Sequence, residues 1–224
     1  MKKVAVILGT RPEIIKLSPI IRELTKKKAD FFIIHTNQHY DANLDEIFFR
    51  DLNLPKAKYN LNIGSHPRAK QIKKMVNAIV RVLKKEKPDV CLVQGDTNTV
   101  LAGALASDRL DIKVGHIEAG LRSYDMAMPE EINRIKTDKI SNWLFAPTQK
   151  SATTLKKEKL PGKIIVTGNT IVDAVLQNKK LINTKPAGKY AVLTMHRPSN
   201  VDSKKILLDV LSGLAKIPEN NIWP

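Results

Sequence analysis

The stretch KVAVILGTRPEIIK, residues 3–16, sets the pattern of the whole chain. Residues 3–8 form a largely apolar run that predicts a buried strand, and Gly9 ends that strand. Thr10 can cap a helix, and Glu13 follows three residues later to complete a capping box. The stretch therefore predicts a strand that leads directly into a helix, which is the repeating unit of α/β folds.

The same unit recurs along most of the chain. Further strands are expected over residues 31–36, 89–94, 112–117, 143–146 and 163–167, and further helices over residues 44–49, 68–87, 97–110, 129–140, 149–159 and 170–182. Alternation of this kind is typical of a parallel sheet with right-handed crossovers and helices on both faces. The sequence therefore predicts an α/β fold with a Rossmann-like parallel sheet.

The C-terminal part breaks the pattern. Residues 183–189 contain a proline and a glycine and are typical of a linker, after which a strand over 190–195 and a helix over 203–216 are expected. One strand and one helix cannot bury both faces of a sheet. We therefore expect a Rossmann-like domain over residues 1–168, and a linker helix with an incomplete second domain over residues 169–224.

Composition limits the class of protein. The chain has 224 residues, of which 42% are hydrophobic, so it can build a core. It has no run of the roughly 18 apolar residues that a membrane span needs. The single cysteine, Cys91, lies in an apolar run, which indicates an inert core residue rather than a reactive thiol. Without an internal disulfide, a cytoplasmic location is expected.

The net charge of +16 raises the alternative of a nucleic-acid-binding protein. The lysines are spread over the polar faces and ends of expected helices, however, and the aromatic content is only 5%. Single-stranded nucleic acid is usually held by basic residues interleaved with aromatic ones. Solvated helix faces therefore explain the charge better, and we expect neither a nucleic acid nor a membrane as partner.

An anion site is the first functional hypothesis. Arg11 and Lys16 lie near the start of a helix, where backbone N–H groups and the helix dipole favour phosphate or carboxylate. Only one glycine, Gly9, is present where the dinucleotide fingerprint needs three. An ordinary capped helix explains the same residues equally well.

Carboxylates follow the ends of two neighbouring expected strands. Asp96 comes directly after Gly95, which follows the strand expected over residues 89–94. Glu118 follows the strand expected over residues 112–117, and two small residues, Ala119 and Gly120, come after it. Glu130 opens the helix after the longest loop. Such groups can divide acid and base work at one cleft. The alternatives are a helix N-cap for Asp96 and a favourable dipole position for Glu130.

The five histidines give weaker signals. His35 and His39 are four residues apart but on a strand and its loop, so we expect no metal site. His116 lies inside a buried strand and is expected to be a core residue. His196 with Arg197 follows the last expected strand, where the pair would suit a diphosphate.

Seven stretches in order resemble the non-hydrolysing UDP-N-acetylglucosamine 2-epimerases. The matching stretches are Gly9–Glu13, Gln38–Asp41, Gly95–Thr97, Gly115–Arg122, Pro129–Arg134, Thr167–Thr170 and His196–Arg197. The resemblance implies a two-domain glycosyltransferase-B-like fold, with the start of a second Rossmann-like domain here. It also implies reversible inversion at C2 of UDP-N-acetylglucosamine, giving UDP-N-acetylmannosamine for surface polysaccharide or glycan synthesis. The implied route is proton removal at C2 with elimination of UDP, then re-addition on the other face.

The resemblance also implies residue roles. The catalytic group would comprise Asp96, Glu118, Glu130 and His196, and the diphosphate would be held by Arg11, Lys16, His196 and Arg197. Candidates for regulatory or loop contacts are Gln38, His39, Arg68, Arg122 and Arg134. No cofactor and no metal are implied, and a homodimer is expected.

Two motifs of the family are not found in the sequence. Neither the Ser-Gly-Gly motif nor the Gln-Glu-Glu run that grips uridine and phosphate follows, and residues 221–224 differ from the family's continuation. We therefore expect a C-terminally truncated chain. The alternatives are a glycosyltransferase of similar fold that uses a UDP-sugar, and an inactive fragment or basic binding module.

Overall fold

The computed structural model of the chain describes residues 2–38, 42–179, 193–195 and 198–216, with the side chains of all of these except 42–45 and 198–199. Two compact units are present, Met1–Lys179 and Lys180–Pro224. The first contains the sheet and is described here first.

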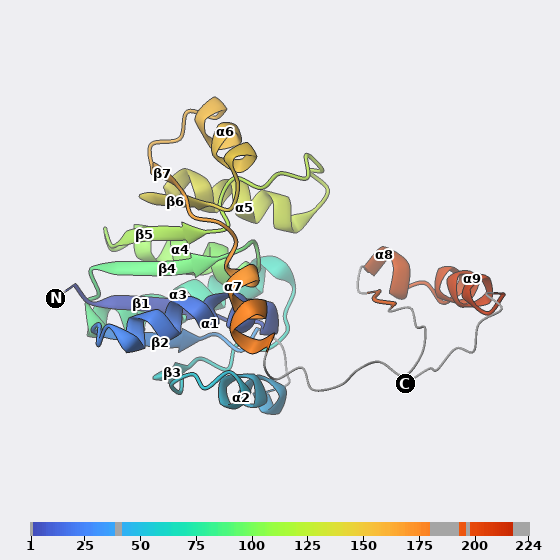
Figure 1. Cartoon of the computed structure of the whole chain (residues 1–224), viewed down its shortest axis with the longest axis horizontal. Helices are drawn as coiled ribbons and strands as arrows, with labels where there is room; N and C mark the ends of the chain where they lie inside the picture. Colours follow the sequence, from blue (N-terminus) through green and yellow to red (C-terminus); the bar gives the residue numbers. More distant parts are fainter. Residues whose placement is uncertain (1, 39–41, 180–192, 196–197, 217–224) are drawn as a thin grey trace. The chain divides into compact units, whose positions relative to one another are not determined.

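A seven-stranded sheet forms the centre of the first unit (Figure 1). Its strands are β1 Val4–Leu8, β2 Phe31–His35, β3 Tyr59–Asn60, β4 Val90–Gln94, β5 Lys113–Ile117, β6 Trp143–Ala146 and β7 Lys163–Val166. Every neighbouring pair is parallel, in the order β3-β2-β1-β4-β5-β6-β7. The strand order changes direction between β1 and β4, which is where open α/β sheets bind ligands.

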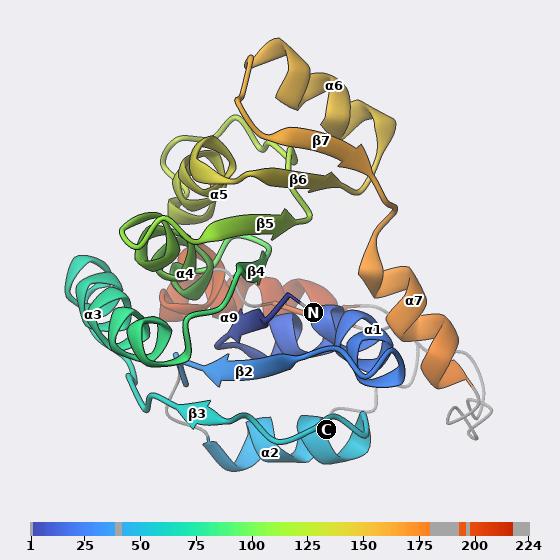
Figure 2. The ribbon, with the colours of Figure 1, turned by 90° about the vertical axis from the view of Figure 1, so that its left-hand side faces the viewer.

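Helices cover both faces of this sheet. They are α1 Arg11–Lys26, α2 Ala42–Asp51, α3 Arg68–Glu86, α4 Asn98–Asp108, α5 Pro129–Ile140, α6 Gln149–Lys157 and α7 Thr170–Asn178. Alternate residues of the strands point to opposite faces. Thus Ala5 and Ile7 pack with α3 and α4, whereas Val6 and Leu8 pack with α1 and α2. Figure 2 shows α3 and α4 on one side of the sheet and α1 with α7 on the other.

The predicted strand–helix alternation is confirmed through α7. The sequence missed β3, which has two residues and pairs only through Ile34 with Tyr59 and His35 with Asn60. Helix α7 packs against α1 inside the first unit, where Arg22 donates hydrogen bonds to Gln177 and Asn178. The boundary predicted at residue 168 stays a prediction.

The second unit contains two described helices, α8 Pro198–Val201 and α9 Lys204–Leu214. Among the described residues of α9 no side chain is buried, and Leu208 is half exposed. The sequence missed the single turn of α8. The strand expected over residues 190–195 lies mostly outside the described residues, and its last three residues form no strand.

Cys91 is buried between the sheet and α3 and α4. Burial raises the pKa of its thiol to about 12. The thiolate is therefore scarce at neutral pH, and the prediction of an inert core cysteine is confirmed.

Glu86 lies at the end of α3, close to the start of β1. Its carboxylate accepts hydrogen bonds from Lys3 Nζ at 2.6 Å and from the hydroxyl of Tyr59, and it pairs with Lys58 Nζ at 2.7 Å. The hydrogen bonds from Lys3, Lys58 and Tyr59 lower the pKa of Glu86 to about 2. The cluster fixes the edge strand β3 to α3 and β1.

This cluster predicts a loss of stability in acid. Because the folded pKa of Glu86 lies below its ordinary value of 4.5, its contribution is present above pH 4.5 and is lost as the pH falls to about 2. The free energy of unfolding of the Glu86→Gln variant, measured in urea, should therefore fall less steeply across this range than that of the wild type. Parallel curves would contradict the assignment, and exposed Glu23→Gln serves as the control.

Candidate functional site

The carboxyl ends of β1, β4 and β5 bring the predicted acidic and basic residues to one edge of the sheet. Glu118 follows β5 and has a φ of +69°, a left-handed conformation that is strained for any residue with a side chain. Its carboxylate is 9% exposed and accepts hydrogen bonds from Lys16 Nζ at 2.8 Å and from the carboxamide of Gln94. Three elements thus hold one strained, buried carboxylate.

Asp96 follows β4 and is not a helix cap. The N-cap of α4 is Thr97, whose hydroxyl accepts the N–H of Val100, so the carboxylate of Asp96 is left for other partners. It pairs with Arg134 at 2.5 Å, and 34% of its side chain is exposed. The site therefore contains a second carboxylate with a cation of its own.

Arg134 connects the two carboxylate-bearing loops. From inside α5, one guanidinium nitrogen meets Asp96 and another donates to the backbone carbonyl of Glu118. Asn133, its neighbour, donates to the carbonyl of Asp96 at 2.9 Å and accepts a hydrogen bond from Arg68 at 2.7 Å. Arg134 and Arg68 are predicted from the sequence as regulatory or loop contacts, whereas no role is predicted for Asn133.

A small hollow of about 200 Å³ opens beside Asp96 and Arg134. The exposed side chain of Glu130 also lines it. The next residue, Glu131, is buried and accepts the backbone N–H groups of Ser123 and Tyr124, so it orders the loop before α5. Both glutamates line the hollow, but only Glu130 is exposed to solvent.

The backbone cradle expected at the start of α1 is largely used by the protein itself. The N–H groups of Gly9 and Thr10 both donate to Glu13 at 2.7 Å, and Pro12 has no N–H. An anion here would depend mainly on the exposed side chain of Arg11, whose guanidinium lies 5.8 Å from the ring centre of Phe48.

Glu13 does more than complete the predicted capping box, which is present. Its second carboxylate oxygen accepts the hydroxyl of Thr97 at 2.6 Å, and the side chain is almost fully buried. One carboxylate thereby joins the Gly9–Arg11 turn to the turn that carries Asp96. The sequence did not predict this contact with Thr97, because the capping box already explained an acidic residue at position 13.

The pH dependence of stability should reveal Glu13. Burial raises its pKa from 4.5 to about 7, against the opposing effect of its hydrogen bonds. Its contribution is thus fully present below pH 4.5 and is lost as the pH rises through about 7, at a cost of about 3 kcal/mol.

The Glu13→Gln variant should remove most of this loss, since an amide can accept from Gly9 and Thr10 and donate to Thr97. Urea unfolding at about pH 5 and about pH 8 measures the difference in the free energy of unfolding. An equal loss in the variant and the wild type would show that another group titrates.

A buried charge network lies beneath the site. His116 is fully buried, as predicted, and contacts Asp138 through Nδ1 at 2.7 Å and the carbonyl of Gly95 through Nε2 at 2.8 Å. The ring is thus held between a carboxylate and a backbone carbonyl. Asp138 also pairs with Arg122 at 2.8 Å. Burial works to raise the pKa of Asp138, but the charges of His116 and Arg122 hold it below its ordinary value.

Packing requires a glycine at position 120, two residues after Glu118. Its φ is +80°, and a Cβ there would lie 2.6 Å from the carbonyl oxygen of Ser151 in α6. Close packing against α6, rather than the approach of a ligand, therefore requires this glycine.

Not all predicted residues meet at this edge. Arg122 lines the same hollow as Asp96, but its guanidinium is engaged by Asp138 and Glu158 rather than by Asp96 or Glu118. Gln38 accepts the N–H and the hydroxyl of Thr99 at the start of α4. His39, His196 and Arg197 lie outside the described residues. The roles predicted for all of these stay predictions.

Among the described residues, no group of three or more histidine, cysteine, aspartate or glutamate side chains is placed to hold a metal ion. In the same part of the chain, no helix has the length and apolar character needed to cross a membrane.

The chain is similar in sequence to proteins of a known family. A family model described as UDP-N-acetylglucosamine 2-epimerase matches residues 22–223. A UDP-N-acetylglucosamine 2-epimerase of Methanocaldococcus jannaschii is 55% identical over an alignment of 229 positions, which covers 97% of this chain and 63% of the relative. One of Methanococcus maripaludis is 54% identical over an alignment of 240 positions, which covers all of this chain and 65% of the relative.

Solved structures give the same likeness. The crystal structure of the Methanocaldococcus jannaschii UDP-GlcNAc 2-epimerase in complex with UDP-GlcNAc and UDP matches with a TM-score of 0.90 and 56% identity, over 96% of this chain and 62% of that one. The chain thus spans slightly less than two thirds of the relatives it matches. The predicted glycosyltransferase-B-like α/β fold class is confirmed.

Proposed function

Because the chain belongs to the UDP-N-acetylglucosamine 2-epimerase family, we propose that it reversibly inverts C2 of UDP-N-acetylglucosamine to give UDP-N-acetylmannosamine. The observation that carries the proposal is the pair of carboxylates at the ends of β4 and β5, each held by its own cation. Proton removal from carbon on one face and proton return on the other needs two such groups.

The reaction proceeds by elimination and re-addition. A carboxylate takes the C2 proton, the C–H electron pair forms a C1=C2 double bond, and the C1–O bond breaks to release UDP. UDP then adds back at C1, and a second acid returns a proton to C2 from the opposite face. The enzyme-bound intermediate is 2-acetamidoglucal, and the reaction consumes no oxidant or reductant.

The ion pairs suit these steps. Lys16 and Gln94 keep the carboxylate of Glu118 fixed in place, where it is positioned to serve as a base. Asp96 is a third exposed and can exchange protons with water. Glu130 is a third candidate and lines the hollow beside Asp96. The division of acid and base roles among the three is part of the experimental test.

Basic side chains are assigned to bind the diphosphate. Arg11 is exposed at the start of α1, and Lys16 lies one turn further along the same helix. We assign both to the diphosphate, together with His196 and Arg197 on the basis of their motif. A homodimer, a cytoplasmic location and supply of the product to glycan synthesis complete the proposal.

The direct test incubates the 224-residue chain separately with each of the two UDP-sugars and separates the products by anion-exchange chromatography. Both reactions should approach the same mixture of UDP-N-acetylglucosamine and UDP-N-acetylmannosamine. Formation of free UDP with sugar transfer to an added acceptor would favour a glycosyltransferase. No conversion by a folded chain would contradict the proposal.

A further inference from the structure

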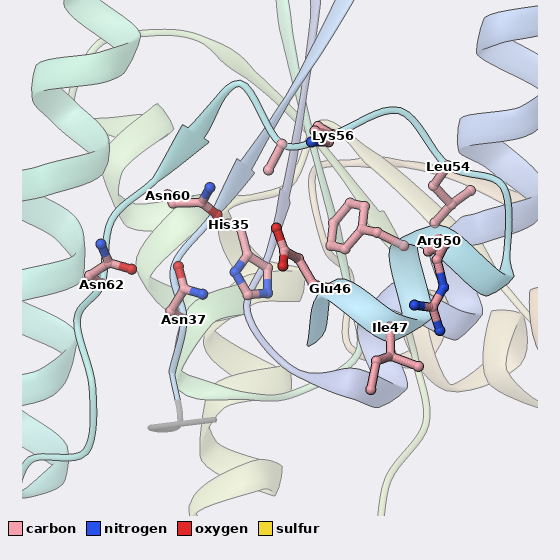
Figure 3. Close-up of a pocket in the computed structure, with 11 residues that line it drawn as sticks. His35, Asn37, Glu46, Ile47, Arg50, Leu54, Lys56, Asn60 and Asn62 are labelled. Atoms are coloured by element: carbon pink, nitrogen blue, oxygen red, sulfur yellow. The ribbon is translucent and has the colours of Figure 1, made fainter. Parts of the chain in front are cut away.

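A second and larger hollow lies outside the site described above. It has a volume of about 860 Å³ and opens between α2 and the carboxyl ends of β2 and β3 (Figure 3). None of its described lining residues belongs to the carboxylate site. Volumes of this order are ordinary for pockets that hold small molecules.

Asn37 forms part of the buried floor of this hollow. Its φ of +51° is a left-handed conformation, its exposed fraction is only 7%, and its backbone carbonyl accepts the N–H of Gly64. Its side-chain oxygen is buried and receives no hydrogen bond from any described residue. Figure 3 shows this side chain beside His35 and facing Asn60. A buried acceptor without a donor is rare, and it indicates a missing hydroxyl or N–H group.

The walls add a second kind of recognition. Asn60 and Asn62 present carboxamides, each of which can both donate and accept. Phe49 and Leu54, both nearly buried, supply an apolar surface opposite. Amides beside an aromatic ring suit a ligand with hydroxyl groups on one side and C–H groups on the other.

Among the described lining residues, the rim carries more positive than negative charge. Arg50 and Lys56 are exposed there, and Glu46 is the one acidic side chain in this described set. The pairing of Arg50 with Asp51 is a surface contact with both partners more than half exposed, so it binds the guanidinium weakly. The rim can therefore receive an anionic group.

We propose that this hollow binds a sugar-sized polyol that carries one anionic group, either phosphate or carboxylate. A ligand hydroxyl donates to Asn37 Oδ1, the ring lies against Phe49, and the anionic group meets Arg50 and Lys56. The proposal does not depend on the epimerase reaction, because none of these residues has a role in it.

Calorimetric titration of the wild-type chain tests this without turnover. The probes are glucose 1-phosphate, glucuronate, glucose and inorganic phosphate. The structure predicts saturable binding of glucose 1-phosphate or of glucuronate, and weaker binding of glucose and of phosphate alone. Which of the first two probes binds more tightly shows whether the anionic group is a phosphate or a carboxylate. If no probe binds, or if phosphate binds as well as glucose 1-phosphate, the proposal is overturned.

Variants then locate the binding. Arg50→Gln with Lys56→Gln should weaken binding of the better probe by about tenfold, the loss expected for one charge-assisted hydrogen bond. The charge-matched control, Arg81→Gln with Lys84→Gln on the exposed face of α3, should leave it unchanged. Asn37→Gly, which tolerates the positive φ, should also weaken it. Equal weakening by the control pair, or unchanged binding by Asn37→Gly, would overturn the assignment.

Discussion

Replacing Glu118 with glutamine is expected to slow epimerisation by about 10²–10⁴-fold, the usual contribution of a positioned acid or base. Glutamine has nearly the same shape, and the left-handed backbone at this position imposes the same strain on both residues. Its partner Lys16 is 26% exposed and can be solvated when the carboxylate is removed, so the fold should persist. The measurement is the initial rate of UDP-N-acetylmannosamine formation, with a circular dichroism spectrum of each variant.

The control for this experiment is Glu23→Gln, which changes an exposed carboxylate on α1 whose partner is a surface lysine. Its rate should equal that of the wild type. A Glu118→Gln variant that is folded and retains more than about a tenth of the wild-type rate would remove Glu118 from the chemistry.

Replacing Asp138 with asparagine is expected to lower the free energy of unfolding by about 3–5 kcal/mol, the range for removing one partner of a buried ion pair. Asp138 is fully buried and holds His116 at 2.7 Å, Arg122 at 2.8 Å and the N–H of Gly120 at 3.2 Å. The neutral amide would leave the buried guanidinium of Arg122 and the ring of His116 without the anion they share. Urea unfolding at neutral pH measures the change.

Asp108→Asn, at the exposed end of α4, is the matched control and should change the free energy of unfolding by less than about 0.5 kcal/mol. A loss of less than about 1 kcal/mol in Asp138→Asn would show that the network beneath the site does not support the fold. Because His116 contacts the carbonyl of Gly95, the same variant should also disturb the turn that carries Asp96.

The pattern of apolar runs predicted the fold through α7 because the central strands β1, β2, β4 and β5 are largely buried and helices such as α1 and α3 have one apolar stripe. β3 was not predicted because a strand of two residues is too short to show an alternation of apolar and polar side chains, and its pairing depends on the neighbouring β2. Arrangements of this kind are set by tertiary packing rather than by local preference.

Only part of the site was predicted, because its contacts also depend on tertiary packing. Strand ends indicated that Asp96 and Glu118 would be neighbours, but not that Arg134 would contact both of their loops from α5. The carboxylate of Glu13 satisfied a local capping rule, so its second bond, to Thr97, had no signal in the sequence. The spacing of residues predicts which groups reach an edge of the sheet, whereas the partner of each group depends on packing.

Deuterium exchange tests the central claim most directly. The 224-residue chain is incubated with UDP-N-acetylglucosamine in D2O, and the C2 proton is followed by proton NMR. The account predicts loss of the C2 proton signal together with a deuterated product of the manno configuration, both of which are lost in the Glu118→Gln variant. A folded chain that leaves the C2 proton in place, or one that exchanges it equally well without the Glu118 carboxylate, would contradict the account.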